Sequence, residues 1–341
     1  MALTLVRTPA QAVLIDGQEP HPPARPPRAA LDLYRQATDL MKDDVLPAAA
    51  RLTRANAAAL DHTYGARRGA AQHTAVAIAA LGLALLATLL ALQVLFTRRT
   101  HRMVNPSVAT ASALVVAFTV AGTVLFAAEA EQLRVAKEDA FDSVLALTQA
   151  RAIGYDANAD ESRFLVDPER SSRYEQAFLD KSQQLARLPR ATLTTYDGRL
   201  ADAIQRYRND HADLVFDGLY GRAFRNITFP GERERAERTI ALYQQYERDD
   251  RHLRALAAKG NLRAAVEFNT SYAVGGSNHD FTAYDRSLES LIALNHQHFD
   301  ASIRDGRRAL RGWSYIPALA VVVCTVLIVT GVRPRLVEYR A

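Results

Sequence analysis

Cysteine is almost absent from this sequence, since Cys324 is its single instance. One cysteine cannot close a disulfide within the chain or build a cysteine-based metal site. His296 and His298 lie two positions apart in a segment of helical pattern, so they point to different faces and do not form a metal-binding pair. The sequence therefore predicts no metal ion and no cofactor.

Catalytic motifs are lacking as well. The sequence contains no nucleophile elbow, no glycine-rich phosphate loop and no zinc-ligand spacing. The acidic pair Asp249 and Asp250, close to His252, is expected to lie on a solvated helix face. We therefore expect a protein that is not an enzyme.

Lysine is scarce, and the basic residues are mostly arginines interspersed with Asp and Glu along the chain, giving a net charge of +5. Such mixed charge is typical of solvated helix faces and of segments that flank a membrane, whereas nucleic-acid-binding proteins concentrate positive charge in patches. We expect no nucleic-acid partner.

Asp, Glu, Lys, Arg and His are missing from three long apolar runs, at residues 75–96, 108–128 and 313–332. Each run has about 20 residues, and a helix of that length spans the roughly 30 Å of a bilayer core. The sequence therefore predicts three transmembrane helices in a multi-pass cell-membrane protein. Because ion and proton pathways need polar groups at membrane depth, a transporter is disfavoured.

The loop between the first two spans, residues 97–107, carries Arg98, Arg99 and Arg102 and no acidic residue. The positive-inside rule gives most weight to short loops, and it places this loop in the cytoplasm. It follows that residues 129–312 are extracytoplasmic and that the tail 333–341 is cytoplasmic. Arginines just before the third span count against this topology, namely Arg304, Arg307, Arg308 and Arg311.

Apolar residues recur at spacings of three and four throughout residues 129–312, and strand-like alternation is absent. Pro168, Pro189 and the turns at 229–231 and 275–276 divide the pattern. Among the predicted helices, one covers 198–225, the next extends to about Tyr272, and the last continues unbroken into Trp313. We predict an all-α fold with an extracytoplasmic antiparallel four-helix bundle and one short additional helix.

The N-terminal region has two parts. Residues 1–30 are rich in proline without periodicity and are predicted to be disordered. Residues 31–73 form an amphipathic pattern that Pro47 interrupts, and one such helix cannot bury its apolar stripe alone. Its junction with the first span resembles the junction at the third span, which favours either a remnant of a duplicated sensor bundle or the basic flank common to membrane-entering helices.

Short segments carry a resemblance to a known class of proteins. They are Ala157–Ser162 after the first long helix, Lys259–Ala265 in the fourth, and Val45–Ala49 in the N-terminal helix. With the layout of spans, they resemble the extracytoplasmic four-helix-bundle sensor domains of bacterial chemoreceptors. The tandem layout is also similar to actinobacterial multi-pass membrane components of amino-acid sensing. The resemblance implies a solute-binding protein outside the cell and a serine/threonine kinase inside.

One charged cluster is a candidate ligand- or partner-binding site. Arginine pairs well with a carboxylate, and Asn or Asp with an amine, so the cluster could bind a small amino acid or a partner's surface. The alternative is a charged solvated helix face. The candidate residues are Arg151, Asp156, Asn158, Asp160, Glu161 and Arg163.

The sequence thus predicts a membrane sensor or signal-transmitting subunit that receives a small ligand or a solute-binding protein on its helical ectodomain. Because only residues 333–341 follow the third span, a separate cytoplasmic kinase or other effector is expected to provide the output. A homo-oligomer is compatible with this layout. The alternative function is a membrane scaffold or accessory subunit that does not sense.

Overall fold

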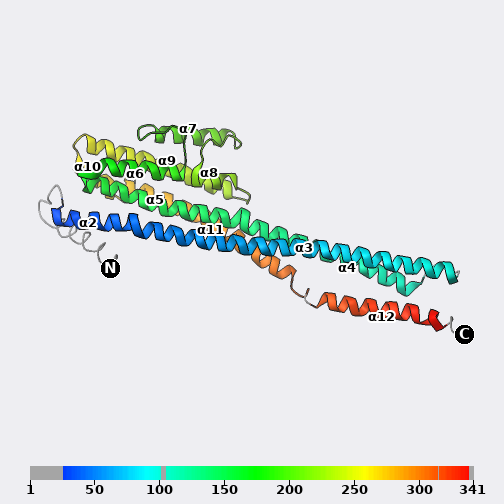
Figure 1. Ribbon diagram of the computed structural model, residues 1–341. Coiled ribbons are helices and arrows are strands. Elements are labelled where there is room, and N and C mark those ends of the chain that lie inside the picture. Colours follow the sequence, from blue (N-terminus) through cyan, green and yellow to red (C-terminus); the bar gives the residue numbers. More distant parts are fainter. Residues whose placement is uncertain (1–25, 101–104, 314, 338–341) are drawn as a thin grey trace. The chain divides into compact units, whose positions relative to one another are not determined.

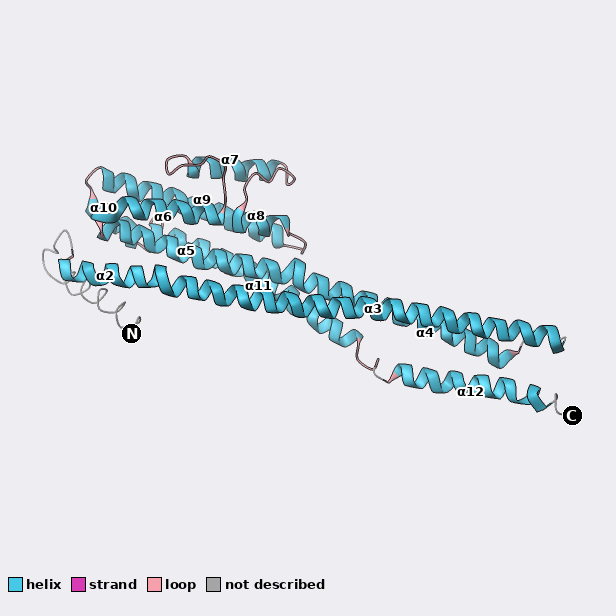
Figure 2. Ribbon diagram, in the orientation of Figure 1, coloured by secondary structure: helices cyan, strands magenta, loops and turns pink. Residues whose placement is uncertain are grey.

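The computed structural model describes residues 26–100, 105–313 and 315–337, and every regular element in these residues is a helix (Figure 2). The all-α prediction is therefore confirmed for the described part of the chain. Most of the predicted tail 1–30 lies outside the described residues, as do positions 101–104 of the predicted loop 97–107 and positions 338–341 of the predicted tail 333–341.

The chain divides into two compact units. The polar unit comprises Asp139–Gln297 together with the described residues up to Ala58. The span unit comprises Ala59–Glu138 together with the described residues from His298 onward. Each unit is described by itself.

The polar unit is built from helices of different lengths (Figure 1). The N-terminal helix α2 begins at Arg28, three residues before the predicted start, and a π-helical segment, Met41–Val45, joins it to α3. The other helices of this unit are α5 (Asp142–Val166), α6 (Ser171–Leu185), α7 (Tyr196–Asn209), α8 (Gly218–Arg225), α9 (Glu232–Ala258), α10 (Leu262–Thr270) and the first part of α11 (Ser277–Ala309).

Two predicted helices of this unit are each divided in the structure. The helix predicted over 198–225 ends at Asn209, because the Asp210 carboxylate accepts the Ala212 N–H at 2.9 Å and turns the chain. The helix predicted to reach Tyr272 ends at Ala258, because Gly260 adopts φ +77° and the Asn261 side chain caps α10.

The core of the polar unit is rich in tyrosine. Tyr196, Tyr220, Tyr243, Tyr246 and Tyr284 are each at most 1% exposed, and they pack with leucine and isoleucine from α5, α6, α7, α9 and α11. Buried phenols need hydrogen-bond partners. The Tyr220 and Tyr284 hydroxyls lie 2.5 Å apart, and the Tyr196 hydroxyl donates to the carbonyls of Ser182 and Ala186. The bonds of Tyr196 fix α7 against the end of α6, and the Tyr220–Tyr284 contact joins α8 to α11.

The span unit contains the long apolar helices: most of α3 (Leu46–Thr100), α4 (Pro106–Arg134) and α12 (Ile316–Val337). Three helical stretches of the described chain, Arg28–Arg98, Pro106–Val166 and Ile316–Arg333, include segments long and apolar enough to cross a membrane. By length and composition, the prediction of three candidate spans is confirmed.

The helices of the span unit are joined by close packing and by a side-chain hydrogen bond. A Cβ atom added at Gly82 of α3 would lie 2.0 Å from the Thr119 hydroxyl of α4, so the two helices approach closely at a glycine. The Asn105 side chain accepts the Ser107 N–H at the start of α4 and donates to the Gly331 carbonyl of α12 at 2.8 Å. One amide therefore caps α4 and joins it to α12.

The prediction of an unbroken helix into the third span is wrong. Helix α11 ends at Ala309, turns follow, and α12 begins at Ile316, so the third apolar helix is shifted toward the C-terminus relative to 313–332. Gly312 has φ +89°, a conformation that ends helices. Trp313 lies in the turn and stacks on Phe118 of α4, with ring centroids 5.2 Å apart and an interplanar angle of 8°.

Candidate functional site

Three of the six predicted site residues come together on α5. Asp156, Asp160 and Arg163 follow each other at spacings of four and three, which places them on one helix face. The Arg163 guanidinium lies 2.9 Å from the Asp156 carboxylate and 2.5 Å from that of Asp160. Lys181 of α6 completes the cluster, 2.5 Å from Asp156 and also paired with Asp160.

This cluster contains two carboxylates and two cations, which neutralise each other. Burial alone would raise the pKa of Asp156, but Lys181 and Arg163 outweigh it and hold that pKa below its usual value. The Asp160 side chain is only 3% exposed. Because these charges are directed at one another, the arrangement joins α5 to α6 and leaves little bonding capacity for a ligand.

Arg151 lies apart from that cluster. Its guanidinium forms two hydrogen bonds to Asp285 of α11, at 2.7 and 2.9 Å, and the Tyr155 hydroxyl donates to the same carboxylate at 2.8 Å. Burial would raise the pKa of Asp285, but the hydrogen bonds from Arg151 and Tyr155 lower it. The bidentate pair therefore connects α5 to α11.

The remaining two predicted residues face inward. Glu161 is fully buried and accepts a hydrogen bond from the Ser277 hydroxyl at 3.2 Å. Burial raises the pKa of Glu161 well above its usual range, and the neighbouring Asp250 adds to this shift. Asn158 is half-buried on the same helix, and its amide nitrogen has no hydrogen-bond partner among the described residues.

The structure corrects the interpretation of Asp249 and Asp250 as solvated charges. They are 6% and 1% exposed, and Asp250 forms two hydrogen bonds with Arg254 one turn further along α9. Glu247, also buried, accepts hydrogen bonds from Ser182 and Tyr243, yet burial raises its pKa to about 8. These carboxyl groups were missed because helical spacing alone does not show which face of α9 is covered.

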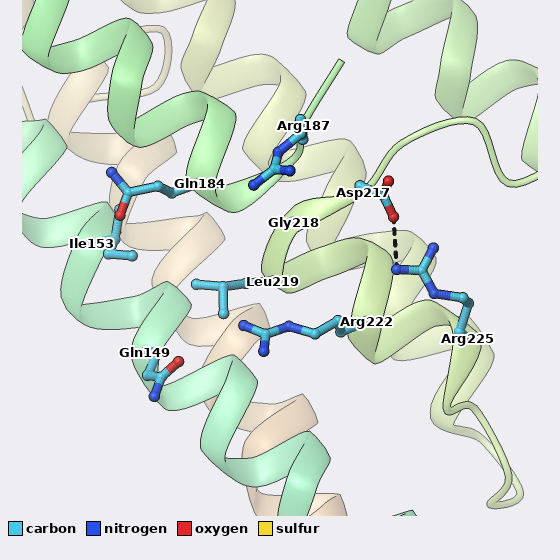
Figure 3. Close-up of a pocket in the computed structure, with 9 residues that line it drawn as sticks. All are labelled: Gln149, Ile153, Gln184, Arg187, Asp217, Gly218, Leu219, Arg222 and Arg225. Atoms are coloured by element: carbon cyan, nitrogen blue, oxygen red, sulfur yellow. Dashed lines mark ion pairs between the residues drawn. The ribbon is translucent and has the colours of Figure 1, made fainter. Parts of the chain in front are cut away.

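A surface pocket of about 550 Å³ lies where α5, α6 and α8 meet (Figure 3). Arg222 extends from α8 toward α5, whereas Arg225 pairs with Asp217 at 2.8 Å. Arg187 approaches from the segment after α6. The pocket is lined by Gln149, Ile153, Gln184, Arg187, Asp217, Gly218, Leu219, Arg222 and Arg225.

None of the six predicted residues lines this pocket. Its arginines were missed because Arg187 and Arg222 are 35 positions apart and lie in segments that only the folded chain brings together. Among the described residues, the structure shows no group of His, Cys, Asp and Glu placed to hold a metal ion. The pocket contains two exposed arginines, Arg187 and Arg222, that pair with no carboxylate of the described residues.

Comparisons with protein-family models, with curated proteins and with solved structures found no match to this chain.

Proposed function

We propose that this protein is a multi-pass membrane sensor or signal-transmitting subunit. The observation that carries the proposal is the 61-residue helical stretch Pro106–Val166, which begins with an apolar candidate span in α4 and, after the π-helical segment Val135–Phe141, ends as α5 of the polar unit. Because the chain runs directly from the span into α5, a small displacement of α5 can be passed on to the span.

On this proposal the long helices α5, α9 and α11, with α6, form an extracytoplasmic antiparallel four-helix bundle. Its exposure to the outside follows from the basic residues of the loop after the first span, including Arg98. Ligand binding would change the packing of α5 against its neighbours, and the change would reach the cytoplasm through α4.

The resemblance to amino-acid-sensing membrane components supports a pair of partners, a solute-binding protein outside and a kinase inside. We propose these partners as the input and the output of the sensor. The partly buried charge pairs that join α5 to α6 and α11, including Lys181–Asp160 and Arg151–Asp285, would keep the receiving helices in register during a shift.

The experiment is purification of the full-length tagged protein from cross-linked native membranes, with and without added amino acids. Co-purification of a solute-binding protein and a kinase, in amounts that change with the added amino acids, is expected. Recovery of a fixed set of membrane proteins that does not respond to them would overturn the sensing proposal in favour of a scaffold.

A further inference from the structure

The pocket between α5, α6 and α8 has an excess of positive charge. It contains three arginines and one aspartate, and that aspartate, Asp217, is already paired with Arg225. Arg187 and Arg222 have no carboxylate partner among the described residues, and both are exposed. Two guanidinium groups at one pocket favour an oxyanion, because each can donate two parallel hydrogen bonds to a carboxylate or phosphate.

The rest of the lining favours an organic anion over an inorganic one. Ile153 and Leu219 supply apolar surface that can contact a short carbon chain, and Gln149 and Gln184 supply amide groups that both donate and accept. In Figure 3, Leu219 lies between the α5 residues and the arginines. A volume of about 550 Å³ is within the range of small-molecule sites.

The wall of the pocket is fixed by the backbone. Arg187 and Asp217 exchange two main-chain hydrogen bonds, at 3.0 and 2.9 Å, which hold the segment after α6 against the start of α8. Gly218 has φ +83°, and a Cβ atom there would lie 2.7 Å from the carbonyl oxygens of Gln184 and Leu185. A pocket assembled on such close backbone contacts is largely pre-formed, which lowers the entropic cost of binding.

We propose that this pocket binds a small organic dianion, with Arg187 and Arg222 pairing with its carboxylates. The pocket would be the ligand site of the sensor. The binding itself is argued from the pocket alone, and only the signal that follows binding rests on the proposed function. It lies against α5, the helix that continues into a candidate span.

The test is isothermal titration of the full-length protein in nanodiscs with succinate. Succinamide, the neutral diamide of the same chain length, and inorganic phosphate are titrated in parallel. We expect succinate to bind and succinamide not to bind. Arg187→Ala and Arg222→Ala should each weaken succinate binding about tenfold or more. Arg208→Ala, which removes an exposed arginine of the same unit outside the pocket, should leave binding unchanged.

Two outcomes overturn the proposal: no succinate binding by the wild-type protein, or equal binding by the Arg187→Ala/Arg222→Ala double variant when circular dichroism shows it folded. Phosphate binding without succinate binding would reject the organic ligand in favour of an inorganic anion. If succinate binds but partner recovery from membranes does not change, the site stands and the sensing function fails. If partners respond to amino acids while succinate does not bind, sensing stands and this site fails.

Discussion

At the residue scale, the polar unit buries several carboxyl groups, among them Asp160, Glu161, Asp167, Glu247 and Asp250. Asp156 and Asp167 pair with arginine or lysine, and the pKa of each lies below its usual value. Others, such as Glu247, receive only neutral hydrogen bonds, and burial raises their pKa. The stability contributed by the carboxyls with lowered pKa is lost as pH falls, whereas the stability contributed by those with raised pKa is lost as pH rises.

Glu247→Gln should stabilise the protein at alkaline pH. The folded-state pKa of Glu247 is raised to about 8, so the folded protein retains a proton that the unfolded chain releases above about pH 4.5. Stability therefore falls as pH rises from about 4.5 to 8, and the glutamine, which keeps the acceptor for Ser182 and Tyr243, removes this loss. We expect a gain of about 1–3 kcal/mol at pH 8 and none near pH 4. Thermal unfolding across this range measures it, and parallel curves for the two proteins would refute it.

Arg35→Ala should destabilise the protein with the opposite pH dependence. Arg35 forms two hydrogen bonds to the fully buried Asp167 carboxylate, at 2.8 and 2.5 Å, and these bonds hold the pKa of Asp167 below its usual value. This stabilisation is present above about pH 4 and is lost as pH falls further. The Tm deficit of the variant should be large at pH 7 and shrink in acid. The matched control is Gln36→Ala on the exposed face of α2, and a deficit independent of pH would contradict this account.

The sequence indicated which charges share a helix face, but it could not indicate their partners. The spacing of Asp156, Asp160 and Arg163 predicts that they meet, and they do. Lys181 and Asp285 lie on other helices, and their pairing depends on tertiary packing that local periodicity does not encode. The six-residue site was predicted as one cluster, whereas Arg151 and Glu161 have separate environments.

At the element scale, the sequence predicted which segments are helical better than it predicted where each helix ends. Pro168 and the glycines at 275–276 were recognised as breaks, since proline and paired glycines interrupt a helix wherever they occur. The end of α7 was not recognised, because the apolar spacing continues through Leu214 and Val215 while the Asp210 carboxylate turns the backbone. The spacing of apolar residues does not indicate a hydrogen bond between a side chain and the backbone.

Two glycine substitutions should have opposite effects. Gly65 lies in the middle of α3 with open space where a Cβ atom would be, so Gly65→Ala should stabilise that helix by about 0.5–1 kcal/mol. Gly260 has φ +77° between α9 and α10, so Gly260→Ala should destabilise by about 1–2 kcal/mol through backbone strain. Thermal unfolding of both variants provides the comparison, and a shift of the same sign in both would be inconsistent with these conformations.

At the scale of the whole molecule, the topology can be tested with cysteine labelling. Cys324 lies in apolar α12 and should react with a membrane-impermeant maleimide only after denaturation. In a Cys324→Ala background, Arg208→Cys in the polar unit should be labelled on intact cells, and Thr100→Cys, in the predicted cytoplasmic loop, only after permeabilisation. The reverse pattern for these two positions would place the polar unit in the cytoplasm and overturn the proposed orientation.

Trp313, in the turn before α12, is the single tryptophan of the sequence and stacks on Phe118. Fluorescence excited at the red edge of aromatic absorption therefore comes from this one side chain, in a protein that has 13 tyrosines. The wild-type protein thus contains its own optical probe at the entrance to the third apolar helix. A rearrangement that separates the indole from Phe118 would change its emission without any added label.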